Sequence, residues 1–167
     1  MNVKKILFPT DFSTVSDAGL PLATSLARDL GATLIVLHVE EPPLAYGGSE
    51  FYYGLPEPDH PALVKMLVQL KPTDSKVPCE HRLRVGDPAH EIVKTAEDEN
   101  VDMIVLSTHG RTGMTRFLMG SIAEQVVRKA QCPVVTLKQP TKGKQPAPKV
   151  EPQRVVATGA EPSLVGK

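Results

Sequence analysis

Three features that mark common protein classes are scarce in the sequence: cysteine, net charge and long apolar runs. Only two cysteines, Cys79 and Cys132, occur in 167 residues, and they lie far apart. This number excludes a disulfide-dense scaffold and a cysteine-rich metal cluster. We expect both thiols to be reduced and to act as small apolar packing groups.

Charge is balanced, because lysine plus arginine and aspartate plus glutamate each contribute 19 residues. No net field attracts nucleic acid or an anionic membrane, so we expect neither as a partner. The opening stretch, MNVKKILFPTD, holds an apolar run too short for a signal peptide or a membrane-spanning helix. We therefore expect a cytoplasmic protein.

Several familiar catalytic motifs are also missing. The sequence holds no G-x-x-x-x-G-K-[ST], no G-x-G-x-x-G after the first predicted strand and no G-x-S-x-G. Its five histidines form no H-x-x-x-H pair, and two scattered cysteines do not complete a zinc site. We expect no catalytic residues of these types and no metal site built from protein ligands alone.

Short runs rich in Val, Ile and Leu alternate with helical patterns along the chain. Such runs are typical of buried strands, and their alternation with helices favours a mostly parallel sheet. The sequence therefore predicts one α/β domain over residues 1–138, with an open five-stranded, Rossmann-like sheet covered by helices on both faces. The predicted strands cover residues 4–10, 32–39, 79–85, 102–108 and 133–138.

The helical patterns come with recognisable ends. Residues 13–30 repeat apolar side chains at helical spacing, with Ser13 or Thr14 as a cap and Gly31 as the stop. Asp87 before Pro88 marks another helix start. Further helices are predicted around residues 62–70 and 122–130, the latter with an apolar face of Ile122, Ala123, Val126, Val127 and Ala130.

Two stretches break the alternation. Residues 42–61 are rich in proline and glycine and carry all three tyrosines, so they form either a surface loop that tucks in its aromatic rings or a lid over a ligand. Residues 139–167 show no apolar period and are predicted to be a disordered tail rich in proline and lysine.

The stretch STHGRTGMTRFLMGS, residues 107–121, follows the predicted strand MIVLS. Ligands of open parallel sheets bind outside the carboxyl ends of the strands, where such loops diverge. Gly110 and Gly113 allow a close backbone approach, and Gly120 with Ser121 stands where the next helix begins. The N–H groups of that helix start, together with the Ser121 hydroxyl, are suited to phosphate oxygens.

Cations in the same stretch fit this interpretation, although simpler explanations stay open. Arg111 and Arg116 could add positive charge beside a phosphate, or they could be solvated surface residues. His109 could be a base or a hydrogen-bonded surface residue. Ser121 with Glu124 matches a capping box, which would explain that serine without any ligand.

This combination resembles the universal stress protein family. The resemblance rests on PTDFS after the first strand, VLHVEE at the end of the second, the HG and GS pairs nine residues apart, and CPVVTLK at the close, and it spans residues 4–138. Family members that bind ATP carry Gly-x-x-Gly, nine residues, and then Gly-Ser or Gly-Thr. Ser107 stands here where the first of those glycines is expected, and Gly110, Gly120 and Ser121 match the rest.

The resemblance also implies roles for residues elsewhere in the chain. Asp11, with Pro9 and Thr10 in the same turn, corresponds to the acidic residue near the nucleotide's ribose and metal. Val39 corresponds to the residue whose main chain meets the adenine edge. Leu106 and Ile122 correspond to positions that flank the glycine motif.

The resemblance implies a protein that binds ATP, with Mg²⁺ carried mainly by the phosphates, and that acts as a stress sensor or regulator. It further implies a homodimer through Val134 to Leu137. We expect slow ATP hydrolysis at most, because no acid or amide lies between Ser107 and Ser121 to hold a water. The alternative is a dimeric interaction module that no longer binds nucleotide, which the serine at position 107 favours.

Overall fold

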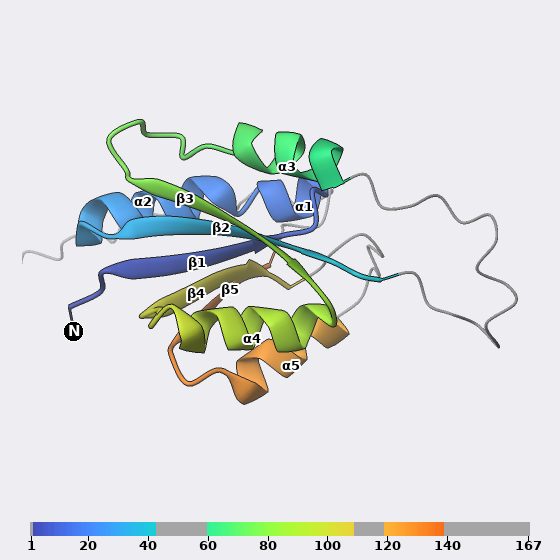
Figure 1. Ribbon diagram of the computed structural model, residues 1–167. Helices are drawn as coiled ribbons and strands as arrows, with labels where there is room; N and C mark the ends of the chain where they lie inside the picture. Colours follow the sequence, from blue (N-terminus) through green and yellow to red (C-terminus); the bar gives the residue numbers. More distant parts are fainter. Residues whose placement is uncertain (1, 43–59, 109–118, 139–167) are drawn as a thin grey trace, which may run out of the picture.

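The computed structural model describes residues 2–42, 60–108 and 119–138 of the chain (Figure 1). Five strands form one sheet in the order β3-β2-β1-β4-β5, and all four neighbouring pairs are parallel. The strands are β1 (Lys5–Thr10), β2 (Thr33–Glu40), β3 (Cys79–Val85), β4 (Met103–Ser107) and β5 (Val134–Leu137). The predicted five-stranded α/β fold is confirmed.

Helices cover both faces of this sheet (Figure 1). One face carries α1 (Thr14–Asp17), α2 (Leu20–Leu30) and α3 (His60–Gln69), whereas the other carries α4 (Pro88–Asp98) and α5 (Ser121–Lys129). Side chains of the central strands alternate between the two faces, as the pleat of a strand requires. Phe8 therefore packs in the cluster under α2, and its neighbour Leu7 packs in the cluster under α4 and α5.

Burial explains why the three central strands read as continuous apolar runs. Both faces of a helix-covered parallel sheet are removed from water, so a strand has no polar side. Leu7, Phe8, Ile35, Val36 and Ile104 each have an exposed fraction of 0%. Each such side chain contributes about 1.5–3 kcal/mol through the area it withdraws from water.

The single helix predicted over residues 13–30 is wrong, because the chain makes two helices there. Ser13 caps α1 by accepting a hydrogen bond from Ser16 N at 3.1 Å, and α2 begins only after Gly19. A Cβ at Gly19 would lie 3.0 Å from the Phe8 ring, so the break lets the chain pass close to β1. The predicted stop is confirmed, since Gly31 ends α2 with φ +67°.

The ends of the other helices follow their sequence signals more closely. The Asp87 side chain caps α4 by accepting a hydrogen bond from His90 N at 2.8 Å, and Pro88 is the first residue of the helix. In α5 only Ala123 and Val126 are buried, whereas Ile122 and Val127 are 40% and 44% exposed. The apolar face predicted for this helix is therefore narrower than expected.

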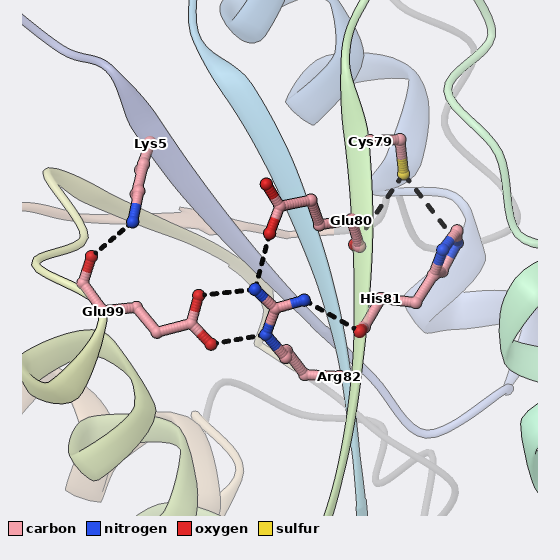
Figure 2. A network of polar contacts seen from close by, with 6 residues as sticks. All are labelled: Lys5, Cys79, Glu80, His81, Arg82 and Glu99. Carbon is pink, nitrogen blue, oxygen red and sulfur yellow. Dashed lines mark hydrogen bonds and ion pairs between the residues drawn. The ribbon is translucent and has the colours of Figure 1, made fainter.

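A network of polar contacts ties the edge strand β3 to the end of α4 (Figure 2). The Arg82 guanidinium donates to both carboxylate oxygens of Glu99, at 2.5 and 2.9 Å, and to Glu80 at 2.5 Å. Lys5 Nζ donates to the Glu99 carbonyl at 2.9 Å, which brings β1 into the same network. Bidentate arginine–carboxylate pairs of this kind fix geometry, so the network holds α4 against the sheet.

Both cysteines are free, half-buried thiols, and burial raises the pKa of each. Cys79 packs against the cluster under α2 and α3, and Cys132 packs against the cluster on the opposite face, as predicted for packing residues. Within the ranges given above, no helix has both the length and the apolar character needed to cross a bilayer. Most of the predicted loop 42–61 and the whole tail 139–167 lie outside the described residues.

Candidate functional site

A cavity of about 590 Å³ lies at the carboxyl ends of β1, β2 and β4, beside the start of α5. The sheet order reverses its direction at β1, which has β2 on one side and β4 on the other. Such switch points leave a crevice because the loops that follow the neighbouring strands diverge. The volume lies within the usual range of small-molecule sites.

The turn after β1 supplies one wall of the cavity and is held in an unusual conformation. Phe12 has φ +59°, in the left-handed region that a bulky residue rarely adopts. Its N–H donates to Thr10 Oγ1 at 3.0 Å, and Asp11 Oδ1 accepts from Ser13 N at 3.0 Å and from Ser13 Oγ at 2.6 Å. These bonds fix the position of the Asp11 carboxylate at the cavity edge.

His38, near the end of β2, supports the same turn from below. The ring is buried, its Nδ1 lies 2.8 Å from the Thr10 carbonyl oxygen, and the Phe12 ring packs on it with centroids 4.2 Å apart. Nearby, burial raises the pKa of Asp17, Asp11 raises it further, and a hydrogen bond from Thr10 at 3.5 Å acts in the opposite direction. The contacts of His38 with Thr10 and Phe12 thus hold the conformation of the turn after β1.

The opposite wall is the start of α5, where the predicted capping box is wrong. Gly120 takes the N-cap position, so Ser121 is the first helical residue and its side chain does not cap the helix. Glu124 N donates to the Gly120 carbonyl at 2.9 Å, as in an ordinary first turn. Because glycine has no side chain to cap with, capping no longer accounts for the hydroxyl of Ser121.

Gly120 also has a packing role at this point. Its N–H donates to the Thr108 carbonyl at 2.8 Å, and a Cβ at this position would lie 3.1 Å from the same oxygen. Thr108 in turn donates to the Leu137 carbonyl through both its N–H, at 2.9 Å, and its hydroxyl, at 3.1 Å. The end of β4, the end of β5 and the start of α5 are thereby joined.

Ser107, the residue that the family resemblance sets at a glycine position, lies in the last position of β4 and pairs with Leu137 of β5. It is not among the described residues with a positive φ, so the strand uses no conformation that demands glycine here. The serine is therefore compatible with the local backbone.

The structure gathers most of the predicted site residues around this one cavity, and four of them lie outside the described residues: His109, Gly110, Arg111 and Gly113. Arg116 lies outside them as well. The predicted residues that line the cavity are Pro9, Thr10, Asp11, Val39, Leu106, Ser107, Gly120, Ser121 and Ile122.

Other lining residues were not predicted from the sequence. Leu63 comes from α3, and Pro88 and Ile92 come from α4, so only the folded arrangement brings them beside β2. His38 and Glu40 stand in a strand that reads as apolar, and a polar residue near a strand end was the one available hint. The further lining residues are Ser16, Leu37, Glu41, Thr108 and Ala123.

Among the described residues, the carboxylates are the charged groups that line the cavity. Asp11, Glu40 and Glu41 line it, and no lysine or arginine does so among the residues with a described position. Nor do the described residues hold a cluster of three or more His, Cys, Asp or Glu side chains that could bind a metal ion. An anionic ligand in this cavity therefore needs cations from elsewhere.

Fold and cavity together define an open-sheet α/β domain with a site at its topological switch point. The chain belongs to the universal stress protein family, because the model of that family matches residues 2–138. It is 37% identical over 145 residues to the universal stress protein MJ0531 of Methanocaldococcus jannaschii, and the match covers 83% of this chain and 84% of that protein.

Solved structures of relatives agree with this assignment. Protein MJ0577 of the same archaeon is similar at 30% identity with a TM-score of 0.61, and the match covers 84% of this chain and 99% of that chain. The universal stress protein of Archaeoglobus fulgidus in complex with dAMP is similar at 26% identity with a TM-score of 0.59, covering 83% and 100% of the two chains.

Proposed function

We propose that this protein binds ATP in the cavity at the carboxyl ends of β1, β2 and β4, and that it acts as a regulator in the response to stress. The observation that carries the proposal is the meeting of nine predicted nucleotide-binding residues around one cavity of suitable size. The relative from Archaeoglobus fulgidus that was solved with dAMP supports an adenine nucleotide as the ligand class.

The chemistry of the lining fits the two ends of a nucleotide. Apolar side chains of Val39, Leu106 and Ile122 can pack on the faces of a purine ring. The first turn of α5 offers N–H groups and the Ser121 hydroxyl, which suit phosphate oxygens. We therefore place the base toward β2 and the phosphates toward α5.

Magnesium fits this arrangement as a partner of the phosphates. Mg²⁺ prefers oxygen ligands and commonly binds through one or two carboxylates together with substrate phosphates. Asp11 is the carboxylate of the β1 turn that could contribute such an oxygen. The bound ion would neutralise part of the phosphate charge, which the acidic side chains of the described lining cannot do.

Ser107 favours the competing proposal, an interaction module that has lost nucleotide binding. Its ordinary strand conformation weakens that alternative, because the backbone does not depend on glycine at this position. The remaining question is whether the added Cβ narrows the space for the ribose or the α-phosphate. A measured affinity for MgATP decides between the two functions.

We also propose that the protein is cytoplasmic. It binds ATP but hydrolyses the bound ATP only slowly. In-line attack on the γ-phosphate needs a positioned water and a group that orients it. Asp11 is the nearest predicted candidate, but its Oδ1 already accepts two hydrogen bonds from Ser13. We expect turnover well below the roughly 10 per second that is typical of enzymes.

Isothermal titration calorimetry with MgATP tests the proposal through a matched pair of variants. Ile122→Glu places a carboxylate in the cavity wall and is expected to weaken binding at least about tenfold through loss of apolar contact and charge repulsion. Val127→Glu makes the same change on the same helix, at an equally exposed residue outside the cavity, and should leave the affinity unchanged. Wild-type protein that binds no MgATP, or equal effects of the two variants, would contradict the proposed site.

A further inference from the structure

The helix α3 forms part of the cavity wall through Leu63, yet little of this helix is buried. Leu67 is its one buried residue. Three of its apolar side chains are exposed: Val64, Met66 and Val68. Most of the stability of a short helix comes from packing of its apolar face. A ten-residue helix that buries one side chain therefore depends strongly on the contacts at its two ends.

Both ends of α3 contact the sheet, whose outer strand β3 runs beside it (Figure 1). At the far end, His81 Nε2 on β3 lies 2.8 Å from the carbonyl oxygen of Leu70, just after the helix. At the start, His60 Nδ1 lies 2.9 Å from Oε2 of Glu40, the last residue of β2. Leu63 follows His60 by one helical turn, so the contact between His60 and Glu40 is the one that positions this part of the cavity wall.

The contact between His60 and Glu40 is an ion pair whose alignment makes no hydrogen bond. Oε2 of Glu40 is buried, and no group among the described residues donates a hydrogen bond to it. The His60 side chain is 52% exposed, so its ring exchanges protons with solvent. Without an aligned N–H the attraction depends on charge, and an imidazole is positive only when both ring nitrogens carry protons.

The elements around this pair carry other titratable or charged groups. They are Asp11 in the β1 turn, Asp17 on α1, His38 on β2, Glu41 after β2, Lys65 on α3, His81 and Arg84 on β3, and Asp87 and Glu91 around the start of α4. Of these residue types, histidine is the one that ordinarily changes charge between pH 5 and 8. The rings of His38 and His81 contact backbone carbonyl oxygens, whereas the ring of His60 faces a carboxylate.

We propose that protonation of His60 fastens the start of α3 to Glu40, and that loss of this proton releases it, so that pH controls the part of the cavity wall that carries Leu63. A neutral imidazole would leave the buried Glu40 carboxylate without an opposite charge beside it, which is unfavourable. The stabilisation is present at low pH and is lost as the pH rises and His60 loses its proton. The consequence for the ligand rests on the proposed nucleotide binding, whereas the effect on α3 does not.

Hydrogen–deuterium exchange of the full, ligand-free chain, followed by mass spectrometry, tests the effect on α3. After correction for intrinsic exchange rates, the amides of α3 should open about threefold more at pH 8 than at pH 6, a modest change because solvent screens a half-exposed pair. His60→Gln should remove this difference. His90→Gln is the matched control, because His90 is a 67% exposed imidazole on α4, and it should retain the wild-type difference.

Calorimetric titrations with MgATP at pH 6 and pH 8 test the consequence for the cavity. The phosphates of ATP also change charge in this range, so the informative quantity is the difference between wild type and variant. The affinity of the wild-type protein should fall between pH 6 and pH 8 by about threefold more than that of His60→Gln. Glu40→Gln removes the other partner of the ion pair and should show the same weaker pH dependence as His60→Gln.

The outcomes separate this inference from the function on which part of it rests. Equal opening of α3 at the two pH values in the wild type, or the same pH dependence in His60→Gln, would overturn the switch while leaving nucleotide binding intact. The same pH dependence of MgATP affinity in wild type and His60→Gln would overturn its link to the cavity. A pH-dependent α3 in a protein that binds no MgATP would support the switch and overturn the proposed function.

Discussion

The Nδ1 atom of His38 lies 2.8 Å from the carbonyl oxygen of Thr10, and this contact joins the end of β2 to the turn that carries Asp11. The same ring packs on Phe12, whose φ of +59° is unfavourable by itself. His38 therefore helps to hold the turn in the conformation that directs Asp11 to the cavity edge. It is a supporting residue in the cavity wall.

Replacing His38 by alanine should lower the free energy of unfolding by about 2 kcal/mol, because it leaves a small void and a buried carbonyl without its partner. Urea denaturation monitored by circular dichroism measures this change. His90→Ala is the control, since the side chain of His90 is 67% exposed and its loss should change stability by less than about 0.5 kcal/mol. Equal stabilities of the two variants would show that His38 does not support the turn.

Replacing Gly120 by valine should abolish MgATP binding and leave the far-ultraviolet circular dichroism unchanged. The backbone of Gly120 has φ −59° and ψ 148°, which any residue can adopt, so the helix α5 that follows it should persist. The valine side chain would crowd the Thr108 carbonyl and the space in front of α5. Undiminished binding in calorimetry would rule out phosphates at this helix start.

The carboxylate of Asp102 should make a small, pH-dependent contribution to stability. Lys4 N and Lys5 N donate to its Oδ2 at 2.8 and 3.0 Å, and these two backbone hydrogen bonds lower its pKa from the ordinary value of 3.8. A lowered pKa in the folded state stabilises the protein above pH 3.8, and this contribution is lost as the pH falls through the lower folded value.

Asp102→Asn should therefore be less stable than wild type at pH 6, by less than about 1 kcal/mol because solvent screens the group. The difference should shrink as the pH is lowered below 4, and urea denaturation across pH 3 to 7 measures it. A difference that grows toward low pH would contradict the assigned direction of the pKa shift.

The strand β5 forms an edge of the sheet, which supports the predicted homodimer through Val134 to Leu137. All four of its residues are only half-buried, and edge strands of natural proteins are usually covered or paired. Multi-angle light scattering should give twice the chain mass of 18.1 kDa at micromolar concentration. A monomer under these conditions would refute this dimer.

The alternation of strands and helices could be predicted from the sequence because each buried strand is a run of consecutive apolar residues. Two predictions that rest on a single residue are also confirmed, because Gly31 ends α2 and Asp87 caps α4. The break at Gly19 could not be seen, because the helical period continues through it and the close approach of Phe8 from β1 and Leu137 from β5 is visible only in the fold. Local pattern thus determines elements, whereas contacts between distant elements determine their interruptions.

The candidate site was predictable to the extent that its residues lie in the stretches that carry the family resemblance. Val39 and Asp11 came from the family resemblance, and both line the cavity. Leu63 was missed because a single sequence does not reveal which helix lies beside the end of β2. Glu40 was missed because the stretch VLHVEE does not show which of its side chains line the cavity. The wrong capping box at Ser121 has a simpler cause, since a shift of one residue in a helix start exchanges the cap for the first helical position.

A crystal structure of the protein grown with saturating MgATP tests the central claim most directly. We predict nucleotide density in the cavity, with the purine ring against Val39 and Ile122 and the phosphates in front of Gly120 and Ser121. An empty cavity at saturating ligand, or a nucleotide bound at another part of the surface, would contradict the proposed function.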